Sequence, residues 1–474
     1  MNNMRLGSMR NIIKVHLLVL GLLFISSCHI IRKYQRPDDL NFNSSLHWKE
    51  GKDSASIAMT SWKDFFKDSL LKQHIATALN NNLDVKDAYS RLNIAKAYLD
   101  QSTQAFAPTL SLGPSVSYQT SSQNSQLGGL FGERKHIIQY ELGLNVGWEA
   151  DIWGKLKSAR RSAYAQMMQS DMVVNTIKSR LVAEISGAYY QLMALDRQKE
   201  ILEVSIANRK QNLETTKALK DAGILNIVAV QQSEAQTFNA EAQLENTLLS
   251  IQQLENYICK LEGTVYHPIS RAKLSDRWAD VALMHGVPSD LLSNRPDVLQ
   301  AEYALQSSVE LENVARAQMY PSLRIDASTG LQSIDFSNLF SIPSLFASAV
   351  GSLTQPILNR GVLRTMKRVS ELQKNQAYLN YKNTLIQASS EVTDALFSID
   401  AQDKILDLKK KEYEAYESAI ANSKELVNYG MTNYLEVLLA TDNSLQAQIA
   451  YTNAFNTKWQ SVIQLYLALG GGWR

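Results

Sequence analysis

The sequence has little cysteine, little proline and no excess of charge. Its 474 residues include 2 Cys and 9 Pro, and 48 Lys and Arg nearly balance 46 Asp and Glu, for a net charge of +2. The balanced charge excludes a broadly basic surface, so we expect no nucleic-acid partner. Because proline interrupts helices, its scarcity permits very long ones.

Residue patterns that carry covalent chemistry are missing as well. The 7 His are scattered, and none pairs with Cys or carboxylates at the spacing of metal ligands. The sequence has no phosphate-binding loop, dinucleotide fingerprint or nucleophile elbow. Gly470-Gly471-Gly472 lacks the Lys and the helix that should follow a phosphate loop. We therefore expect no enzyme, no catalytic residue, no metal site and no cofactor.

One apolar run stands at the N-terminus. Val15–Ile25 follows a basic stretch and is short for a membrane span, so residues 1–27 are predicted to be a signal peptide. The run ends in Ile25-Ser26-Ser27-Cys28, which resembles a bacterial lipobox. We expect Cys28 to carry a covalent lipid and residues 28–60 to form a polar tether. The alternative is a short N-terminal membrane anchor with an incidental Cys.

The rest of the chain is a duplication. Leu83-Asp84-Val85 recurs as Pro296-Asp297-Val298, about 213 residues later. Gly223-Ile224-Leu225-Asn226 recurs as Gly430-Met431-Thr432-Asn433, about 207 residues later. A period this long is not that of a solenoid. We expect two structural repeats, 61–288 and 289–474.

Each repeat contains two segments in which apolar and polar residues alternate. Alternation over about ten residues predicts strands of membrane-crossing length, at about 109–118, 140–150, 322–331 and 345–355. The loops at about 119–138 and 332–344 would then be extracellular. Four strands cannot close a membrane barrel. We expect three copies to supply twelve strands, although a dimer with eight satisfies the arithmetic; the alternative is a pair of hairpins in a soluble sheet.

Long helices fill most of the remaining sequence. Apolar residues fall every seven positions at Val174, Leu181, Ala188, Leu195 and Leu202, which indicates coiled-coil packing. This pattern predicts long helices at about 153–222 and 361–429 and return helices at about 226–262 and 432–469. A short helix from Ser61 through Leu71 and helices at about 81–106 and 289–319 complete the set. We expect each of the last two to stack end to end on a return helix, beside a long one. The fold class is thus mainly α with a small membrane β part.

At this point the chain resembles the TolC-like outer membrane factor family, in its lipoprotein branch. The resemblance covers nearly all of the mature chain and rests on motifs in the family's order. They are Trp62 with Phe65-Phe66-Lys67-Asp68, Asp151-Ile152-Trp153-Gly154-Lys155, Leu292-Ser293-Asn294-Arg295-Pro296-Asp297, Tyr320-Pro321-Ser322-Leu323, Gln355-Pro356-Ile357, Tyr429-Gly430 with Asn433-Tyr434-Leu435, and Gly470-Gly471-Gly472-Trp473.

The resemblance implies a homotrimer with a twelve-stranded barrel in the outer membrane and a periplasmic helical tunnel. Its implied partners are outer membrane lipid, a periplasmic adaptor and an inner-membrane pump of the resistance-nodulation-division type. It also implies passive export of small molecules such as drugs, toxic compounds or metals. The alternatives are a conduit for type I protein secretion and a lipid-anchored periplasmic scaffold without a pore.

The resemblance also implies where the functional residues lie. The family contacts its adaptor at the helix tips, which here are Gly223, Ile224, Gly430 and Met431. Relatives close the channel with a Leu, an Asp and an Arg; the equivalent positions here are Leu435, Leu439 and Asp442. An ionic gate therefore cannot be carried over intact. We expect a ring of Leu435 and Leu439 beside a ring of Asp442 carboxylates that could bind cations. The alternative is that both leucines are ordinary coiled-coil core.

Overall fold

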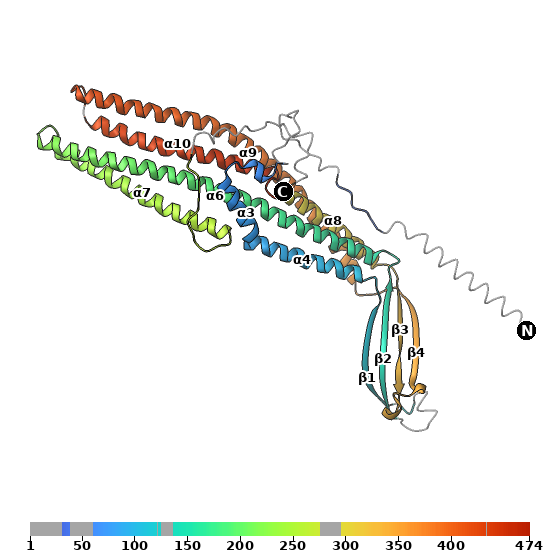
Figure 1. Cartoon of the computed structure of the whole chain (residues 1–474). Coiled ribbons are helices and arrows are strands. Elements are labelled where there is room, and N and C mark those ends of the chain that lie inside the picture. Colours follow the sequence, from blue (N-terminus) through green and yellow to red (C-terminus); the bar gives the residue numbers. More distant parts are fainter. Residues whose placement is uncertain (1–30, 38–59, 121, 125–135, 275–294, 433) are drawn as a thin grey trace, which may run out of the picture. The chain divides into compact units, whose positions relative to one another are not determined.

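The computed structural model describes residues 31–37, 60–120, 122–124, 136–274, 295–432 and 434–474 (Figure 1). The chain divides into two compact units. Residues 93–169 and 302–380, with the N-terminal segment, form the first unit, which contains all the strands described. Residues 37–92, 170–301 and 381–474 form the second, which contains both helix tips. Cys28 lies outside the described residues, so its lipidation stays a prediction.

The four predicted strands form one antiparallel sheet in the order β1-β2-β3-β4. They are β1 (Thr109–Thr120), β2 (His136–Ala150), β3 (Ser322–Ser333) and β4 (Leu345–Thr354), and each confirms its predicted segment to within a few residues (Figure 1). The central β2–β3 ladder joins the two repeats and places Gly143 opposite Gly330. The sheet therefore ends in one edge from each repeat, β1 from the first and β4 from the second.

The edge strand β1 shows why the alternation predicts a membrane strand. Leu110, Leu112, Val116 and Tyr118 are exposed, and they alternate with small or polar residues. Aromatic side chains mark both ends of this hairpin. The Tyr118 hydroxyl lies 2.6 Å from Nδ1 of His136 near the loop, and Trp148 Nε1 donates to the Phe106 carbonyl at 3.0 Å near the helices. Such aromatic side chains are typical of the two membrane interfaces.

Corresponding helices in the two halves of the chain have equal lengths. The long helices α6 (Lys155–Asp221) and α9 (Val362–Asn428) have 67 residues each, and the return helices α7 (Ile227–Leu261) and α10 (Tyr434–Ala468) have 35 each. The shorter helices α4 (Leu83–Gln104) and α8 (Pro296–Ala317) have 22 each. Among the described residues, no helix is both long and apolar enough to cross a membrane.

The predicted end-to-end stacking is confirmed by one side chain at each junction. Asn82 Nδ2 donates to the carbonyl of Leu261, the last residue of α7, at 2.9 Å, and its Oδ1 accepts from the Val85 amide inside α4 at 3.0 Å. In the second repeat, Arg295 Nη1 donates to the carbonyl of Ala468, the last residue of α10, at 2.8 Å. Each junction thus satisfies a helix end that would otherwise lack a partner.

The first predicted short helix is wrong in extent. It breaks after α2 (Trp62–Phe65), and a separate helix α3 runs over Ser69–Asn81. The break has a local cause, because Asp68 Oδ1 accepts from the Leu70 amide at 2.8 Å and starts a new helix there. The core of the second unit, which contains α2 and α3, includes stacked aromatic side chains. The ring centroids of Tyr190 and Trp459 lie 4.3 Å apart.

Candidate functional site

The first helix tip is a compact hydrogen-bonded turn. Past the end of α6, the Gly223 amide donates to the Lys220 carbonyl at 3.0 Å, and the Ile224 amide donates to the Leu219 carbonyl at 2.9 Å. This pair of bonds is the Schellman arrangement, which needs a left-handed residue. Gly223 supplies it with a φ of 75°. Asn226 then caps α7 by accepting from the Ala229 amide at 3.1 Å.

The second tip repeats these two Schellman bonds. The Gly430 amide donates to the Val427 carbonyl at 3.0 Å, and the Met431 amide donates to the Leu426 carbonyl at 2.9 Å. Gly430 has a φ of 69°. The duplicated glycines are therefore required by the backbone, whatever else binds at the tips.

Apolar side chains are exposed beside both glycines. Ile224 and Ile227 are exposed at the first tip, and Tyr429 and Met431 at the second. Exposed apolar groups of this kind are typical of surfaces that bind another protein. That an adaptor binds these tips stays a prediction.

The two leucines of the predicted gate lie on the surface of α10. Leu435 is 39% exposed and Leu439 47%, whereas Val437 and Leu438 between them are 2% and 4% exposed. Burial alternates in this way because one face of a helix packs on its neighbours. Leu435 and Leu439 therefore lie on the exposed face of α10 in the single chain. That they line a gate stays a prediction.

Asp442, the third residue of the predicted gate, is held by an arginine of the other hairpin. Arg209 of α6 donates from Nη2 to Asp442 Oδ1 at 2.8 Å. The Arg209 side chain is 5% exposed and that of Asp442 43%. Arg209 also donates to the Gln236 carbonyl of α7 at 3.2 Å and to Ser205 Oγ at 3.3 Å. One guanidinium thus ties α10 to both helices of the first hairpin.

This pairing changes what an Asp442 ring could do. A carboxylate that faces a buried guanidinium at hydrogen-bond distance is already compensated within its own chain. A ring of such carboxylates would repel less and bind cations less strongly than a ring of bare ones. In the single chain, Asp442 therefore joins α10 to α6 through Arg209. Its role at a gate stays a prediction.

Arg209 was absent from the predicted site, although the sequence contains a signal for it. It continues the heptad of Val174, Leu181, Ala188, Leu195 and Leu202 at the next position. A buried charge at a coiled-coil core position needs a partner of opposite charge. The partner lies 233 residues away, so the sequence alone could indicate Arg209 but not Asp442.

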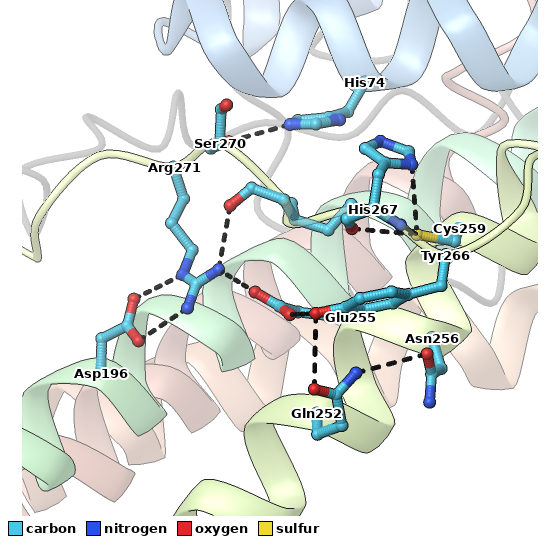
Figure 2. A network of polar contacts seen from close by, with 11 residues as sticks. His74, Asp196, Gln252, Glu255, Asn256, Cys259, Tyr266, His267, Ser270 and Arg271 are labelled. Carbon is cyan, nitrogen blue, oxygen red and sulfur yellow. Dashed lines mark hydrogen bonds and ion pairs between the residues drawn. The ribbon is translucent and has the colours of Figure 1, made fainter.

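A second polar network clamps the segment that follows α7 (Figure 2). Arg271 donates to both carboxylate oxygens of Asp196 on α6, at 2.5 and 2.9 Å, and to Glu255 on α7 at 2.5 Å. The pKa of Arg271 is raised, chiefly by its hydrogen bonds with Asp196. This side chain is therefore permanently charged. The clamp fixes the segment against both helices of the hairpin.

His74 of α3 joins this network with both ring nitrogens facing acceptors. Nδ1 lies 2.6 Å from a Glu262 carboxylate oxygen and Nε2 lies 2.8 Å from the Ser270 carbonyl (Figure 2 shows the second contact). Neither acceptor can donate a proton, so the geometry favours the doubly protonated ring. Burial alone would lower the pKa of His74, but the Glu262 hydrogen bond, the Ser270 hydrogen bond and the charges of Glu262 and Asp68 outweigh it and raise the pKa above 6.5.

Cys259, which has the apolar sequence neighbours Leu254, Ile258 and Leu261, is buried. Its Sγ lies 3.4 Å from the His267 carbonyl and 3.5 Å from His267 Nδ1 (Figure 2). Within the described residues, no group of three or more His, Cys, Asp and Glu side chains could hold a metal ion.

The chain has a sheet with two open edges and paired long helices joined by capped turns. These are the features expected of one protomer of a channel. The family model for outer membrane efflux proteins matches residues 74–264 and 287–471. The chain therefore belongs to the outer membrane efflux protein family, whose members are trimeric outer membrane channels of tripartite efflux systems.

Similar proteins cover almost the whole chain. The probable outer membrane lipoprotein SilC of Salmonella typhimurium is 25% identical over 468 residues, covering 97% of this chain and 99% of that protein. The solvent efflux pump outer membrane protein SrpC of Pseudomonas putida is 26% identical over 472 residues, covering 96% and 97%. The cation efflux system protein CusC of Escherichia coli O6:H1 is 24% identical over 461 residues, covering 95% and 97%.

A solved structure of CusC confirms the fold. It superposes with a TM-score of 0.83 at 22% identity, covering 94% of this chain and 100% of that chain. The chain is thus an outer membrane efflux channel that has its long helices in the periplasm. The alternative of a periplasmic scaffold without a pore is excluded.

Proposed function

We propose that this chain forms a homotrimer in which three sheets close one twelve-stranded barrel. The observation that carries the proposal is the pair of sheet edges, β1 and β4. In lipid, an open edge leaves backbone amides and carbonyls without partners. Pairing β4 of one copy with β1 of the next satisfies both edges, and the trimeric state of family members favours three copies over two.

The proposed trimer is a passive conduit that an adaptor engages at the two tips. The exposed apolar side chains beside Gly223 and Gly430 support this contact, as does the duplicated hydrogen-bonded turn that presents them. An inner-membrane pump of the resistance-nodulation-division type would supply substrate and energy, and the channel itself would do no covalent chemistry. We also include a covalent lipid on Cys28, which the lipobox and the name of SilC support.

Small molecules are the proposed cargo. SrpC is named for solvents and CusC for cations, and such names favour efflux of small compounds over type I protein secretion. In the closed state, Leu435 and Leu439 would narrow the lumen, and the Arg209–Asp442 pair would hold α10 against the first hairpin. The exposure of the two leucines and the burial of Arg209 support this arrangement.

The test combines mass and conductance of the purified, lipidated protein. Light scattering in detergent should give the mass of three chains, and planar bilayers should show small discrete conductance steps. The steps should become larger when Leu435 and Leu439 are both changed to Ser. A monomer or dimer without conductance in any variant would overturn the proposal.

A further inference from the structure

The starts of the two long helices are rich in basic residues. Between Asp151 and Asp171 the chain has no acidic residue, and between Asp335 and Glu371 it has none either. The basic residues in these two stretches are Lys155, Lys157, Arg160 and Arg161 in the first, and Arg360, Arg364, Lys367 and Arg368 in the second. At the start of each long helix, every charged residue is thus basic.

These charges occupy equivalent positions in the two repeats. Lys157 corresponds to Arg364 at an offset of 207 residues, the same offset that relates the tip glycines. Arg160 and Lys367 form a second pair at this offset, and Arg161 and Arg368 a third. Lys stands opposite Arg in two of these pairs, so both repeats keep the charge without keeping the side chain.

Helix stability does not account for these charges. The start of a helix carries partial positive charge, so it favours acidic residues and disfavours basic ones. Neither α6 nor α9 has an acidic residue in its first turn. Several of these cations have a carboxylate beside them: Lys155 pairs with Glu149, Arg161 lies 3.6 Å from Glu310, and Lys367 and Arg368 lie 3.8 and 3.5 Å from Glu371. Within the described residues Lys157 and Arg364 form no ion pair, and both are exposed. Lys157 and Arg364 are thus exposed cations that no carboxylate of the described residues offsets.

The same region exposes unusually large apolar side chains. Ile357 and Leu358, between the end of β4 and the start of α9, are 89% and 95% exposed. They stand directly before Arg360 and Arg364 in a unit that also contains the whole sheet. Because the strands cross the outer membrane, the linker that leaves β4 for the periplasmic helix lies at the periplasmic boundary. Apolar side chains followed by basic ones suit such an interface.

The N-terminal segment adds another cation to this surface. The backbone amide of Arg32 donates to Asn313 Oδ1 at 3.0 Å, and Asn313 Nδ2 donates back to the Arg32 carbonyl at 2.9 Å. This exchange fixes Arg32 on α8. There it lines a groove of about 660 Å³ in which four cations, Arg32, Arg316, Lys367 and Lys374, outnumber the carboxylates of Glu312 and Glu371.

We propose that this basic surface, made of Arg32, Lys157, Arg364, Lys367 and Arg368, binds anionic phospholipid headgroups of the periplasmic leaflet. Ile357 and Leu358 lie among the acyl chains beneath those headgroups. The inference goes beyond the proposed conduit and rests only on the outer-membrane location. Its physical use is anchorage: a basic patch adds a second attachment to a covalent lipid and sets the depth of the helices relative to the membrane.

Native mass spectrometry of the purified trimer tests this surface. The probes are phosphatidylglycerol and phosphatidylethanolamine with the same acyl chains, added in equal amounts. Wild type should retain phosphatidylglycerol preferentially, and the preference should weaken between about 0.05 and about 0.5 M salt because exposed charges are screened. The triple change Lys157→Gln, Arg364→Gln and Arg368→Gln should reduce the preference by more than about tenfold, since each basic residue near a membrane surface contributes roughly fivefold.

A matched control removes three cations elsewhere. Lys404, Lys410 and Lys424 are exposed on the distal part of α9, and changing all three to Gln should leave the lipid preference unchanged. The triple change Lys157→Arg, Arg364→Lys and Arg368→Lys keeps every positive charge and should also preserve the lipid preference.

Several outcomes would overturn the inference. They are equal retention of both lipids by wild type, a salt-independent preference, and equal losses in the test and control triples. A test triple that fails to form trimers without added lipid, while the charge-preserving triple assembles, would assign these residues to contacts between copies instead. Mass and conductance of the same wild-type preparation report separately on the proposed channel.

Discussion

Asn82 and Arg295 do the same task at equivalent places in the two repeats, 213 residues apart. Asn82 donates to the last carbonyl of α7 at 2.9 Å, and Arg295 donates to the last carbonyl of α10 at 2.8 Å. The second junction is the more strongly tied, because Arg295 also pairs with Asp297 at 2.7 Å and with Glu391 at 2.6 Å. The duplicated chain has thus kept the junction and changed its chemistry.

This difference predicts unequal costs of substitution. Arg295→Ala should destabilise the protein by about 2–3 kcal/mol, because it leaves a buried carbonyl without a donor and two carboxylates without their cation. Asn82→Ala should cost about 1–2 kcal/mol, since it removes a neutral cap. Thermal unfolding followed by circular dichroism measures both. Lys86→Ala, an exposed change on α4, should stay within about 0.5 kcal/mol; the prediction fails if Arg295→Ala behaves like this control.

The sequence could predict these helices and strands because their signals are periodic. Heptads and strict alternation located the main elements, and the repeated offset showed that they occur twice. The contacts that fix the candidate sites are of another kind. Arg271 reaches Asp196 across 75 residues and Arg209 reaches Asp442 across 233. No local period encodes which of many surface carboxylates such a cation meets, so folding alone determines those pairs.

The break between α2 and α3 shows the same limit at short range. Asp68 ends one apolar pattern and caps the next helix, but a single Asp within an apolar pattern is equally compatible with an exposed position on one continuous helix. Capping depends on the backbone conformation at that residue. The sequence therefore predicted helix in this region and placed its boundary wrongly.

His74 predicts a loss of stability at alkaline pH. Its pKa is raised above 6.5 in the folded protein, so the folded state holds this proton more tightly than the unfolded state does. The resulting stabilisation is complete below pH of about 6.5 and is lost as the pH rises through the raised pKa. Unfolding temperatures of wild type and His74→Gln should therefore differ most at acidic pH and converge at alkaline pH.

The groups around His74 supply the controls for this experiment. Glu262 and the nearby Asp68 favour its charge, and His267 lies 3.4 Å from the other oxygen of Glu262. Glu262→Gln should abolish most of the pH-dependent difference, because it removes the carboxylate that holds the proton. His267→Gln should leave most of it in place. A gap between wild type and His74→Gln that widens with rising pH would contradict the assigned direction.

The tip glycines predict a modest cost that arises from the backbone alone. Gly223 and Gly430 have φ values of 75° and 69°, and a Cβ at either position would meet no atom within 4 Å. Gly→Ala at each tip should therefore cost about 1–2 kcal/mol through left-handed strain, without a steric clash. Gly→Asn should cost less, since Asn tolerates this conformation better. Chemical unfolding of the four variants measures the order, and equal losses for Ala and Asn would argue against strain as the cause.

The Arg209–Asp442 pair predicts a link between stability and conductance. Asp442→Asn leaves the buried guanidinium with only neutral partners, so it should destabilise the hairpin contact by about 1–3 kcal/mol. If this pair holds α10 against the first hairpin, the same change should raise the single-channel conductance. Arg209→Met combined with Asp442→Leu should recover stability, because no buried charge remains unpaired, yet conductance should stay high because the tie is still absent. Lys210→Gln is the matched control on α6, since it breaks an exposed pair with Glu241 at 2.7 Å and should change neither property. Conductance that follows stability back to the wild-type level in the double variant would show that general loosening, and not the loss of this tie, opens the channel.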